Sequence, residues 1–161
     1  MEAYLIATAC TKFEKKADQT FKSLTEEVYC DLLKSAKVEN GNMIGQAWFG
    51  NCGMGTFGQN NIRGQVCFTP LVQKKLFPER VGIINVEGGC ATGSMAFHGA
   101  WKDVISGTED VSLAIGVEKI YQPNQPEKIQ EIYDGGIDQF DRSEWLDFYK
   151  SIGDELGKPF D

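Results

Sequence analysis

A single cysteine, Cys90, stands in a run of small residues where nucleophilic chemistry could take place. The apolar stretch 81–84 before it is typical of a strand, and the pattern over 95–105 after it is typical of a helix. Cys90 is therefore expected at a strand-to-helix turn, where unpaired backbone N–H groups and the helix dipole favour an anion. A thiol in that setting loses its proton more readily, and the thiolate is the nucleophilic form. The pattern predicts a nucleophilic cysteine for acyl transfer, and the alternative is a buried thiol beside a tight turn.

Three other side chains could take part in such chemistry, and each has a plainer interpretation. Glu87 could act as a base, but a carboxylate so near Cys90 would oppose thiolate formation, so a structural or interface role is expected. Cys52 lies in the glycine-rich run 50–58 and could line the pocket, but a loop thiol without an evident partner is expected to be inert. His98 follows Cys90 on the same predicted helix at a rise of about 12 Å, too far for a base, so it is expected to be structural.

The periodicities around Cys90 predict an α/β protein with a mostly parallel sheet covered by helices. Strands are expected at residues 4–9, 44–49, 81–86 and 111–117, and helices at 20–36 and 90–105, with another helix beginning within 60–68. The predicted strands are continuous apolar runs, as a sheet that is covered on both faces requires. In the first helix, Ser23 and Glu26 fit a capping box.

Charge divides the chain near residue 121. Residues 122–161 hold ten acidic and four basic side chains, whereas residues 1–121 are nearly neutral, within a total net charge of −7. We interpret 1–121 as the core of one domain and 122–161 as an acidic loop segment with one short helix at 144–152, capped by Ser143. The acidic balance argues against nucleic acid as the main partner.

The cysteines and the apolar runs indicate a reduced, cytoplasmic setting. The five cysteines are odd in number and fifteen or more residues apart, so neither a disulfide framework nor a C-x-x-C metal site is indicated. No apolar run approaches the roughly 18 residues of a membrane span, and residues 1–20 do not have the layout of a signal peptide.

Four segments, taken together and in order, resemble the N-terminal half of thiolases, especially the sterol-carrier-protein-x type. They are Ala-Thr-Ala-Cys-Thr-Lys-Phe at 7–13, Gly-Gln-Asn-Asn-Ile-Arg at 58–63, Asn-Val-Glu-Gly-Gly-Cys-Ala-Thr-Gly-Ser at 85–94 and Asp-Val-Ser-Leu-Ala-Ile-Gly-Val-Glu-Lys at 110–119. The third matches the nucleophile motif of that family, and the fourth resembles the strand and G-x-E turn that follow it. The resemblance covers about residues 4–120.

The resemblance implies a layered βαβαβαβ half-thiolase fold, followed by the start of a loop domain. It implies that Cys90 forms an acyl-enzyme during thiolysis of a 3-ketoacyl-CoA, with coenzyme A as a substrate and no bound cofactor or metal. Gly89, Ala91 and Gly93 are then candidates for lining the pocket or for donating to the developing oxyanion. Family members are dimers or tetramers, and the segment before the nucleophile lies near the dimer interface.

The departures from the family pattern bear on the activity. The G-H-P histidine, the N-E-x-x segment and the second, C-x-G cysteine of the other thiolase half do not occur in this sequence. We therefore expect a second half, from the same or a separate chain, to be required for turnover. A companion protein with a zinc ribbon and an OB-fold, found with some relatives, is compatible with this interpretation. The open alternatives are a condensing enzyme, a thiolase-fold retro-aldolase and a non-catalytic assembly subunit.

Overall fold

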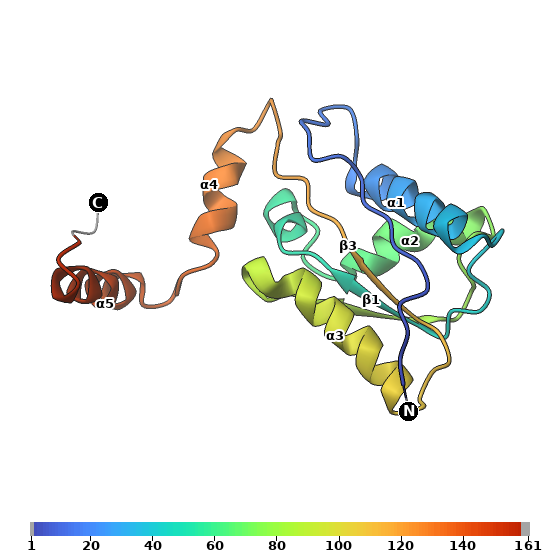
Figure 1. Cartoon of the computed structure of the whole chain (residues 1–161). Helices are drawn as coiled ribbons and strands as arrows, with labels where there is room; N and C mark the ends of the chain where they lie inside the picture. Colours follow the sequence, from blue (N-terminus) through green and yellow to red (C-terminus); the bar gives the residue numbers. More distant parts are fainter. Residues whose placement is uncertain (1, 159–161) are drawn as a thin grey trace.

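Three short strands form one parallel sheet, with helices on both sides of it (Figure 1). The computed structural model describes residues 2–158. The strands are β1 (Gln46–Gly50), β2 (Gly82–Val86) and β3 (Ser112–Gly116), and their order in the sheet is β2-β1-β3. Gln46 is in register with Gly82 on one side and with Ser112 on the other, so all three strands start and end at the same levels. The predicted α/β class is confirmed.

The helices alternate with the strands as far as β3. They are α1 (Phe21–Ala36), α2 (Arg63–Gln73), α3 (Thr92–Ile105), α4 (Glu127–Asp134) and α5 (Arg142–Glu155), with 3-10 turns η1 (Gly53–Phe57) and η2 (Gly89–Ala91). In Figure 1, α1 and α2 lie on one side of the sheet and α3 lies on the other. Over residues 2–158, none of these helices combines the length and apolar character needed to cross a membrane.

The N-terminus of α1 is capped one turn earlier than predicted. The hydroxyl of Thr20 accepts from the backbone N–H of Ser23 at 3.1 Å, and the Ser23 hydroxyl accepts from the Thr20 N–H at 2.8 Å. Glu26, predicted to close the box, instead forms an ion pair with Lys74. The Ser23–Glu26 capping box is therefore wrong, because the extended backbone of Thr20 already supplies the cap.

The strand predicted at residues 4–9 is wrong. This segment has no regular secondary structure. The exposed fraction of the surface is 77% for Tyr4, 68% for Leu5 and 71% for Ile6. An apolar run becomes a strand only where a neighbouring strand satisfies its backbone groups, and residues 4–9 pair with none of the described strands. Over residues 2–158, the observed fold therefore begins with α1 and has three strands instead of the four of the predicted βαβαβαβ order.

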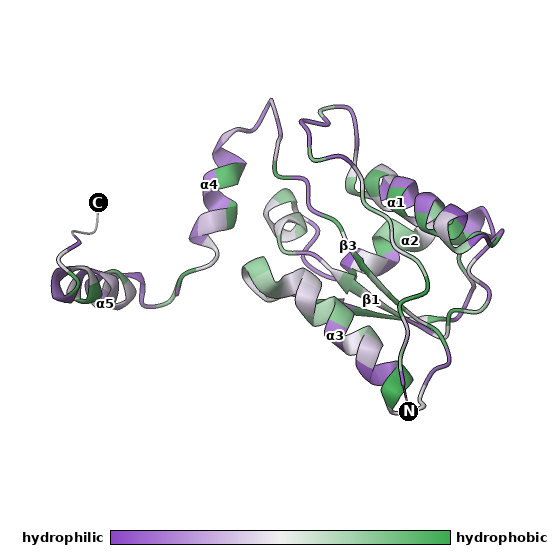
Figure 2. Cartoon of the chain, in the orientation of Figure 1, coloured by the Kyte–Doolittle hydropathy of each residue, from purple (hydrophilic) through white to green (hydrophobic). Residues whose placement is uncertain are grey.

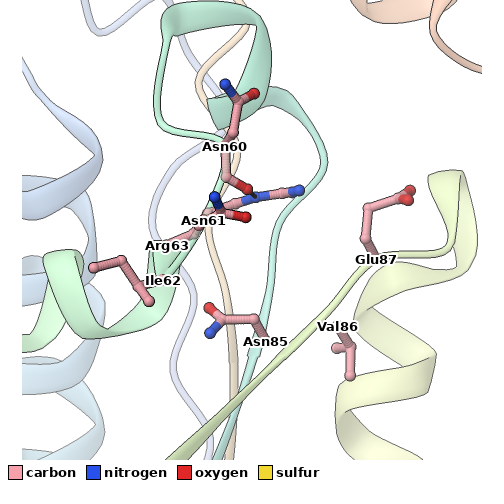
Figure 3. Close-up of a pocket in the computed structure, with 7 residues that line it drawn as sticks. All are labelled: Asn60, Asn61, Ile62, Arg63, Asn85, Val86 and Glu87. Atoms are coloured by element: carbon pink, nitrogen blue, oxygen red, sulfur yellow. Dashed lines mark hydrogen bonds between the residues drawn. The ribbon is translucent and has the colours of Figure 1, made fainter.

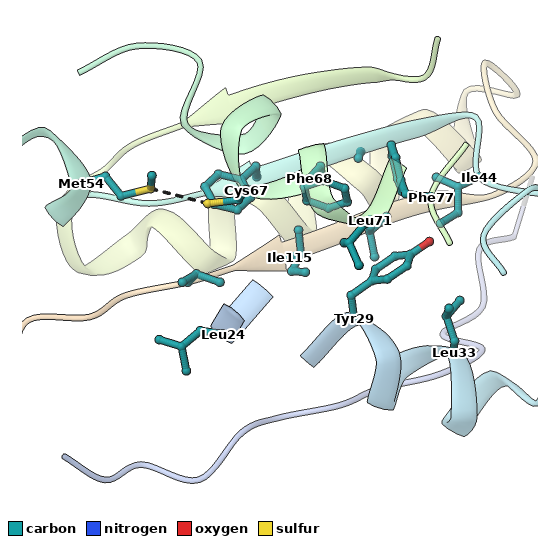
Figure 4. Packing of buried hydrophobic residues seen from close by; sticks show 14 residues of the cluster. Leu24, Tyr29, Leu33, Ile44, Met54, Cys67, Phe68, Leu71, Phe77 and Ile115 are labelled. Carbon is teal, nitrogen blue, oxygen red and sulfur yellow. Dashed lines mark hydrogen bonds between the residues drawn. The ribbon is translucent and has the colours of Figure 1, made fainter. Parts of the chain in front are cut away.

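The core lies between the sheet and the helices α1 and α2 (Figure 4). Its most deeply buried large side chains include Tyr29 from α1, Phe49 from β1, and Phe68 and Leu71 from α2. Figure 2 shows hydrophobic residues along the strands and mixed hydrophilic and hydrophobic residues on α4 and α5. The prediction that every strand is covered on both faces is wrong for β2, where Ile84 keeps 38% of its surface exposed at the edge of the sheet.

Between residues 122 and 158, the acidic segment after β3 contains two helices where one was predicted. The helix predicted at 144–152 is the longer α5, and α4 was not anticipated. Asp141, not Ser143, occupies the N-cap position of α5, and its side chain makes no capping bond. The helix α4 lies against η1, whereas α5 stands apart from the sheet in Figure 1. The boundary at residue 121 stays a prediction.

Because α3 and β1 approach closely, alanine substitutions at two glycines of α3 should differ strongly in their effect on stability. A Cβ at Gly99 would lie 2.3 Å from the Trp48 ring, which Asp103 holds through a 2.7 Å hydrogen bond from Nε1. We expect Gly99→Ala to lower the free energy of unfolding by about 1–3 kcal/mol. Gly93→Ala is the matched control, because a Cβ at Gly93 would meet no atom within 4 Å and alanine has a higher helix propensity than glycine. The free energy of unfolding of this variant should equal or exceed that of wild type. Denaturant unfolding of both full-length variants measures this, and equal stabilities would contradict the close approach.

Candidate active site

The three parallel strands bring their carboxyl ends to one edge of the sheet. Gly50, Val86 and Gly116 end β1, β2 and β3 at the same level of the register. The segments that follow are η1, η2 and the irregular segment that begins at Val117, so residues far apart in the sequence meet there. Ligand sites of open α/β sheets form at this edge.

Cys90 lies in η2, between β2 and α3, and is exposed. The helix predicted from residue 90 thus begins as a 3-10 turn and becomes α-helical at Thr92. The preceding residue, Gly89, has a φ of +56°, a left-handed conformation that favours glycine. The sequence therefore places Cys90 on a tight turn that leaves its side chain accessible.

Thr92 stabilises this turn through hydrogen bonds of its buried side chain and its backbone. Its buried hydroxyl accepts from the Gly88 N–H at 2.9 Å and donates to the Gly89 carbonyl at 2.7 Å. The backbone N–H of Thr92 also donates to the Gly89 carbonyl. One threonine therefore holds two peptide groups of the turn, Glu87–Gly88 and Gly89–Cys90.

The backbone N–H groups of the turn differ in whether they already donate a hydrogen bond within the protein. The Gly89 N–H donates to the Glu87 carboxylate at 2.7 Å, and the Ala91 N–H donates to the Gly88 carbonyl at 3.0 Å. Among residues 2–158, no hydrogen-bond acceptor is found for the N–H of Cys90. Of these three donors, the amide of Cys90 is the one that remains available to a ligand.

Cys52, which follows β1 as the N-cap residue of η1, contacts the same turn. Its Sγ lies 3.1 Å from the Gly89 carbonyl oxygen and 2.9 Å from the Thr92 hydroxyl. Burial raises the pKa of the Cys52 thiol, and the Glu118 and Glu87 carboxylates also raise that pKa, against a lowering by the Thr92 hydrogen bond. The expectation of a thiol without a partner is wrong, because folding brings the ends of β1 and β2 together.

Glu118, Asn51 and Arg63 join the loops behind Cys52. The Glu118 carboxylate accepts from the backbone N–H groups of Cys52 and, at 3.0 Å, of Gly53. The buried Asn51 side chain donates to the Val117 carbonyl at 2.6 Å. Arg63 donates to the backbone carbonyl of Asn51, so its guanidinium holds a loop of its own chain.

An open pocket of about 150 Å³ lies beside the turn (Figure 3). One side comes from the segment that leads into α2, and the other comes from the end of β2; the lining residues are Asn60, Asn61, Ile62, Arg63, Asn85, Val86 and Glu87. Ile62 has a φ of +47°, which is uncommon for a β-branched residue, and keeps 60% of its surface exposed. The pocket places an apolar side chain and several amides near the residues that precede Cys90.

His98 is exposed on α3, and its predicted structural role stays a prediction. Its ring stacks on Trp101, with centroids 5.4 Å apart and planes 15° from parallel. It lies on α3 beyond the turn, and none of the hydrogen bonds around Cys90 includes it. Among residues 2–158, no group of three or more His, Cys, Asp and Glu side chains is placed to hold a metal ion.

Residues 3–140 match the sequence family described as Thiolase, N-terminal domain. The chain belongs to the thiolase family. The match covers most of the chain, including β1, β2, β3 and the Cys90 turn. The narrower sterol-carrier-protein-x type stays a prediction.

Two curated thiolase relatives are similar to this chain. It is 32% identical over 117 residues to the benzoylsuccinyl-CoA thiolase subunit BbsB of Thauera aromatica, and the aligned region covers 73% of this chain. It is also 32% identical over 117 residues to an acetyl-CoA acetyltransferase of Methanocaldococcus jannaschii, which covers 72% of this chain. In both cases the matched part is 28% of the relative's own length, so most of each relative lies outside this comparison.

Sequence reasoning anticipated the position of Cys90 but not the contacts behind it. It did not single out Thr92 or Glu118 as individual residues, and it expected Cys52 to be inert. One available signal was that Cys52 and Glu118 each follow a predicted strand. The ends of parallel strands meet, so polar residues at those ends are expected to approach one another.

Proposed function

We propose that this chain carries the nucleophile of a thiolase that cleaves a 3-ketoacyl-CoA by thiolysis. The observation that carries the proposal is the exposed Cys90, which lies in a tight turn and has an unengaged backbone N–H. Family membership supports acyl-CoA chemistry, and the turn supports a thiol as the group that takes the acyl chain. The substrates are the acyl-CoA and free coenzyme A, and no bound cofactor is required.

In the proposed first step, the Cys90 thiolate attacks the 3-keto carbon of the substrate. The bond between C2 and C3 breaks, its electron pair forms the enolate of the departing acyl-CoA, and a proton is added at C2. In the second step, the thiol of coenzyme A attacks the thioester, gives up its proton to a base and releases Cys90 as thiolate. Each step places negative charge on the carbonyl oxygen, and the amide N–H of Cys90 is the donor of this chain that is suited to stabilise it. Gly89, Ala91 and Gly93 then line the approach to the sulfur.

The base and the second cysteine of this proposal come from a second thiolase half. The names of the two relatives, a benzoylsuccinyl-CoA thiolase subunit and an acetyl-CoA acetyltransferase, differ in acyl group. Together with the predicted sterol-carrier-protein-x type, the first of these favours a bulky or aromatic acyl group. We further propose a dimer or tetramer in the cytoplasm, with a zinc-ribbon and OB-fold companion as an additional partner.

Mass spectrometry of the natively assembled protein tests this proposal. The full-length protein, with every partner chain, is incubated with acetyl-CoA and separately with a 3-ketoacyl-CoA bearing an aromatic group. We expect a thioester on the peptide that contains Cys90, which free coenzyme A removes. A folded complex that takes no acyl group from either substrate would contradict the proposal and favour the assembly-subunit alternative.

A further inference from the structure

Cys52 holds the peptide group that carries the amide N–H of Cys90. The Gly89 carbonyl and the Cys90 N–H belong to one peptide unit, and this bond is trans, as are all described peptide bonds. In a trans peptide, the C=O and N–H bonds point in opposite directions within one plane. Whatever holds the Gly89 oxygen therefore also sets the direction of the Cys90 N–H.

The donors to the Gly89 oxygen come from the protein side of the turn. They are the Thr92 N–H, the Thr92 hydroxyl at 2.7 Å and the Cys52 thiol at 3.1 Å. The single thiol proton is shared between the Gly89 oxygen and the Thr92 hydroxyl, which itself donates to the same oxygen. By either route the thiol strengthens the hydrogen bonding to the Gly89 carbonyl.

We propose that Cys52 is a positioning residue that aims and polarises the Cys90 N–H toward the oxyanion of the reacting carbonyl. Donors to the Gly89 oxygen withdraw electron density through the planar amide, so the Cys90 N–H becomes a stronger donor on the opposite side. The inference deepens the proposed thiolase function and rests on it. It assigns a task to a side chain that would act on the reacting carbonyl through the Gly89–Cys90 peptide group.

The surroundings of Cys52 keep it in the form that can donate. A thiolate would have no proton for the Gly89 carbonyl. Burial raises the pKa of Cys52, as do the carboxylates of Glu118 and Glu87. Glu118 also accepts from the backbone N–H of Cys52, which fixes the position from which the thiol reaches the turn. The two cysteines at this edge therefore have different tasks: Cys52 donates a hydrogen bond, and Cys90 attacks.

If Cys52 has this role, its replacement should slow only those steps that form an oxyanion. An oxyanion-hole donor that is removed outright costs about 10²–10³-fold in rate, and a donor that is merely loosened should cost less, about tenfold. Substrate binding does not depend on this charge, so kcat should fall while KM stays nearly constant. Alkylation of Cys90 by iodoacetamide forms no oxyanion, so its rate should not change.

The experiment compares Cys52→Ala, Cys52→Ser and the control Cys30→Ala in the full-length protein with every partner chain. Cys30 is also a half-buried thiol with a pKa raised by burial, but it lies on α1. Two rates are measured by peptide mass spectrometry: acylation of Cys90 by acetyl-CoA and its alkylation by iodoacetamide. We expect Cys90 of the Cys52→Ala variant to be acylated about tenfold more slowly than in wild type, while its alkylation rate stays within about twofold of wild type. The Cys52→Ser variant keeps a hydrogen-bond donor, so its acylation rate should be within about threefold of wild type. Cys30→Ala should match the wild type in both rates.

Three results would overturn the assignment. One is normal acylation in Cys52→Ala. Another is a parallel loss of acylation and alkylation, which would show that Cys52 only supports the fold of the turn. The third is a Cys52→Ser variant that is as slow as Cys52→Ala, which would exclude the donor role. A wild-type protein that takes no acyl group would instead overturn the proposed function itself, and this assignment with it.

Discussion

Cys90→Ala is expected to abolish acyl transfer while leaving the fold intact. Alanine has no nucleophilic sulfur, so the thioester cannot form, and the rate of coenzyme A-dependent cleavage of a 3-ketoacyl-CoA should fall by at least about 10³-fold. Cys90 is exposed, so the loss of its sulfur creates no cavity and the melting temperature should stay within about 2 °C of wild type. Steady-state kinetics of the full assembly, together with a thermal melt, measure both parts of this prediction.

Cys10→Ala is the matched control for the nucleophile. Cys10 is also exposed, and within residues 2–158 its side chain donates to the carbonyl of the adjacent Thr11. This variant should keep wild-type kinetics. If Cys90→Ala retained a tenth or more of the activity, or if Cys10→Ala lost as much, Cys90 could not be the acyl-carrying residue.

Phe68→Ala is expected to have the largest effect on stability. Phe68 has 1% of its surface exposed, and its ring lies 4.5 Å from Phe77, 5.9 Å from Tyr29 and 6.2 Å from Phe49, between ring centroids. Its removal would leave a cavity at the point where α1, α2 and β1 meet. We expect the free energy of unfolding to fall by about 3–5 kcal/mol. Denaturant unfolding of the full-length protein, with the slope of the transition checked against wild type, measures the loss.

Phe140→Ala controls for the loss of an aromatic ring as such. Phe140 is 99% exposed, so its removal should change the free energy of unfolding by less than about 0.5 kcal/mol. A loss below about 1 kcal/mol for Phe68→Ala would mean that the aromatic cluster is not the centre of the core.

Local patterns in the sequence determined the type and approximate bounds of most elements. The apolar run at 81–86 became β2, and the helical periodicity after Cys90 became α3. The helix rests on interactions between residues a few positions apart, which periodicity describes directly. The strand formed because its apolar run also has β1 as a parallel neighbour. The first predicted strand failed for the opposite reason. Residues 4–9 have strand-like composition, but a strand also needs a neighbour, and composition does not show whether one is present.

The family could be inferred from the sequence, since its four motifs occur in the same order as in thiolases. The Cys90 motif itself also indicated its chemistry, because small residues between a strand and a helix predict an accessible thiol at a helix N-terminus. The residues that support this thiol were not recognised. Cys52 was expected to be a loop thiol without a partner, whereas its sulfur lies 3.1 Å from the Gly89 carbonyl oxygen.

The sequence by itself determined the alternation of strands and helices, the position of Cys90 and the family, because each depends on local order along the chain. The tertiary structure alone decided which residues stand behind Cys90. Cys52 and Gly89 are 37 positions apart, and Cys52 and Glu118 are 66 apart. They meet because β1 lies between β2 and β3, and all three parallel strands end at one edge of the sheet. Strand order results from the packing of the whole core, and no local pattern encodes it.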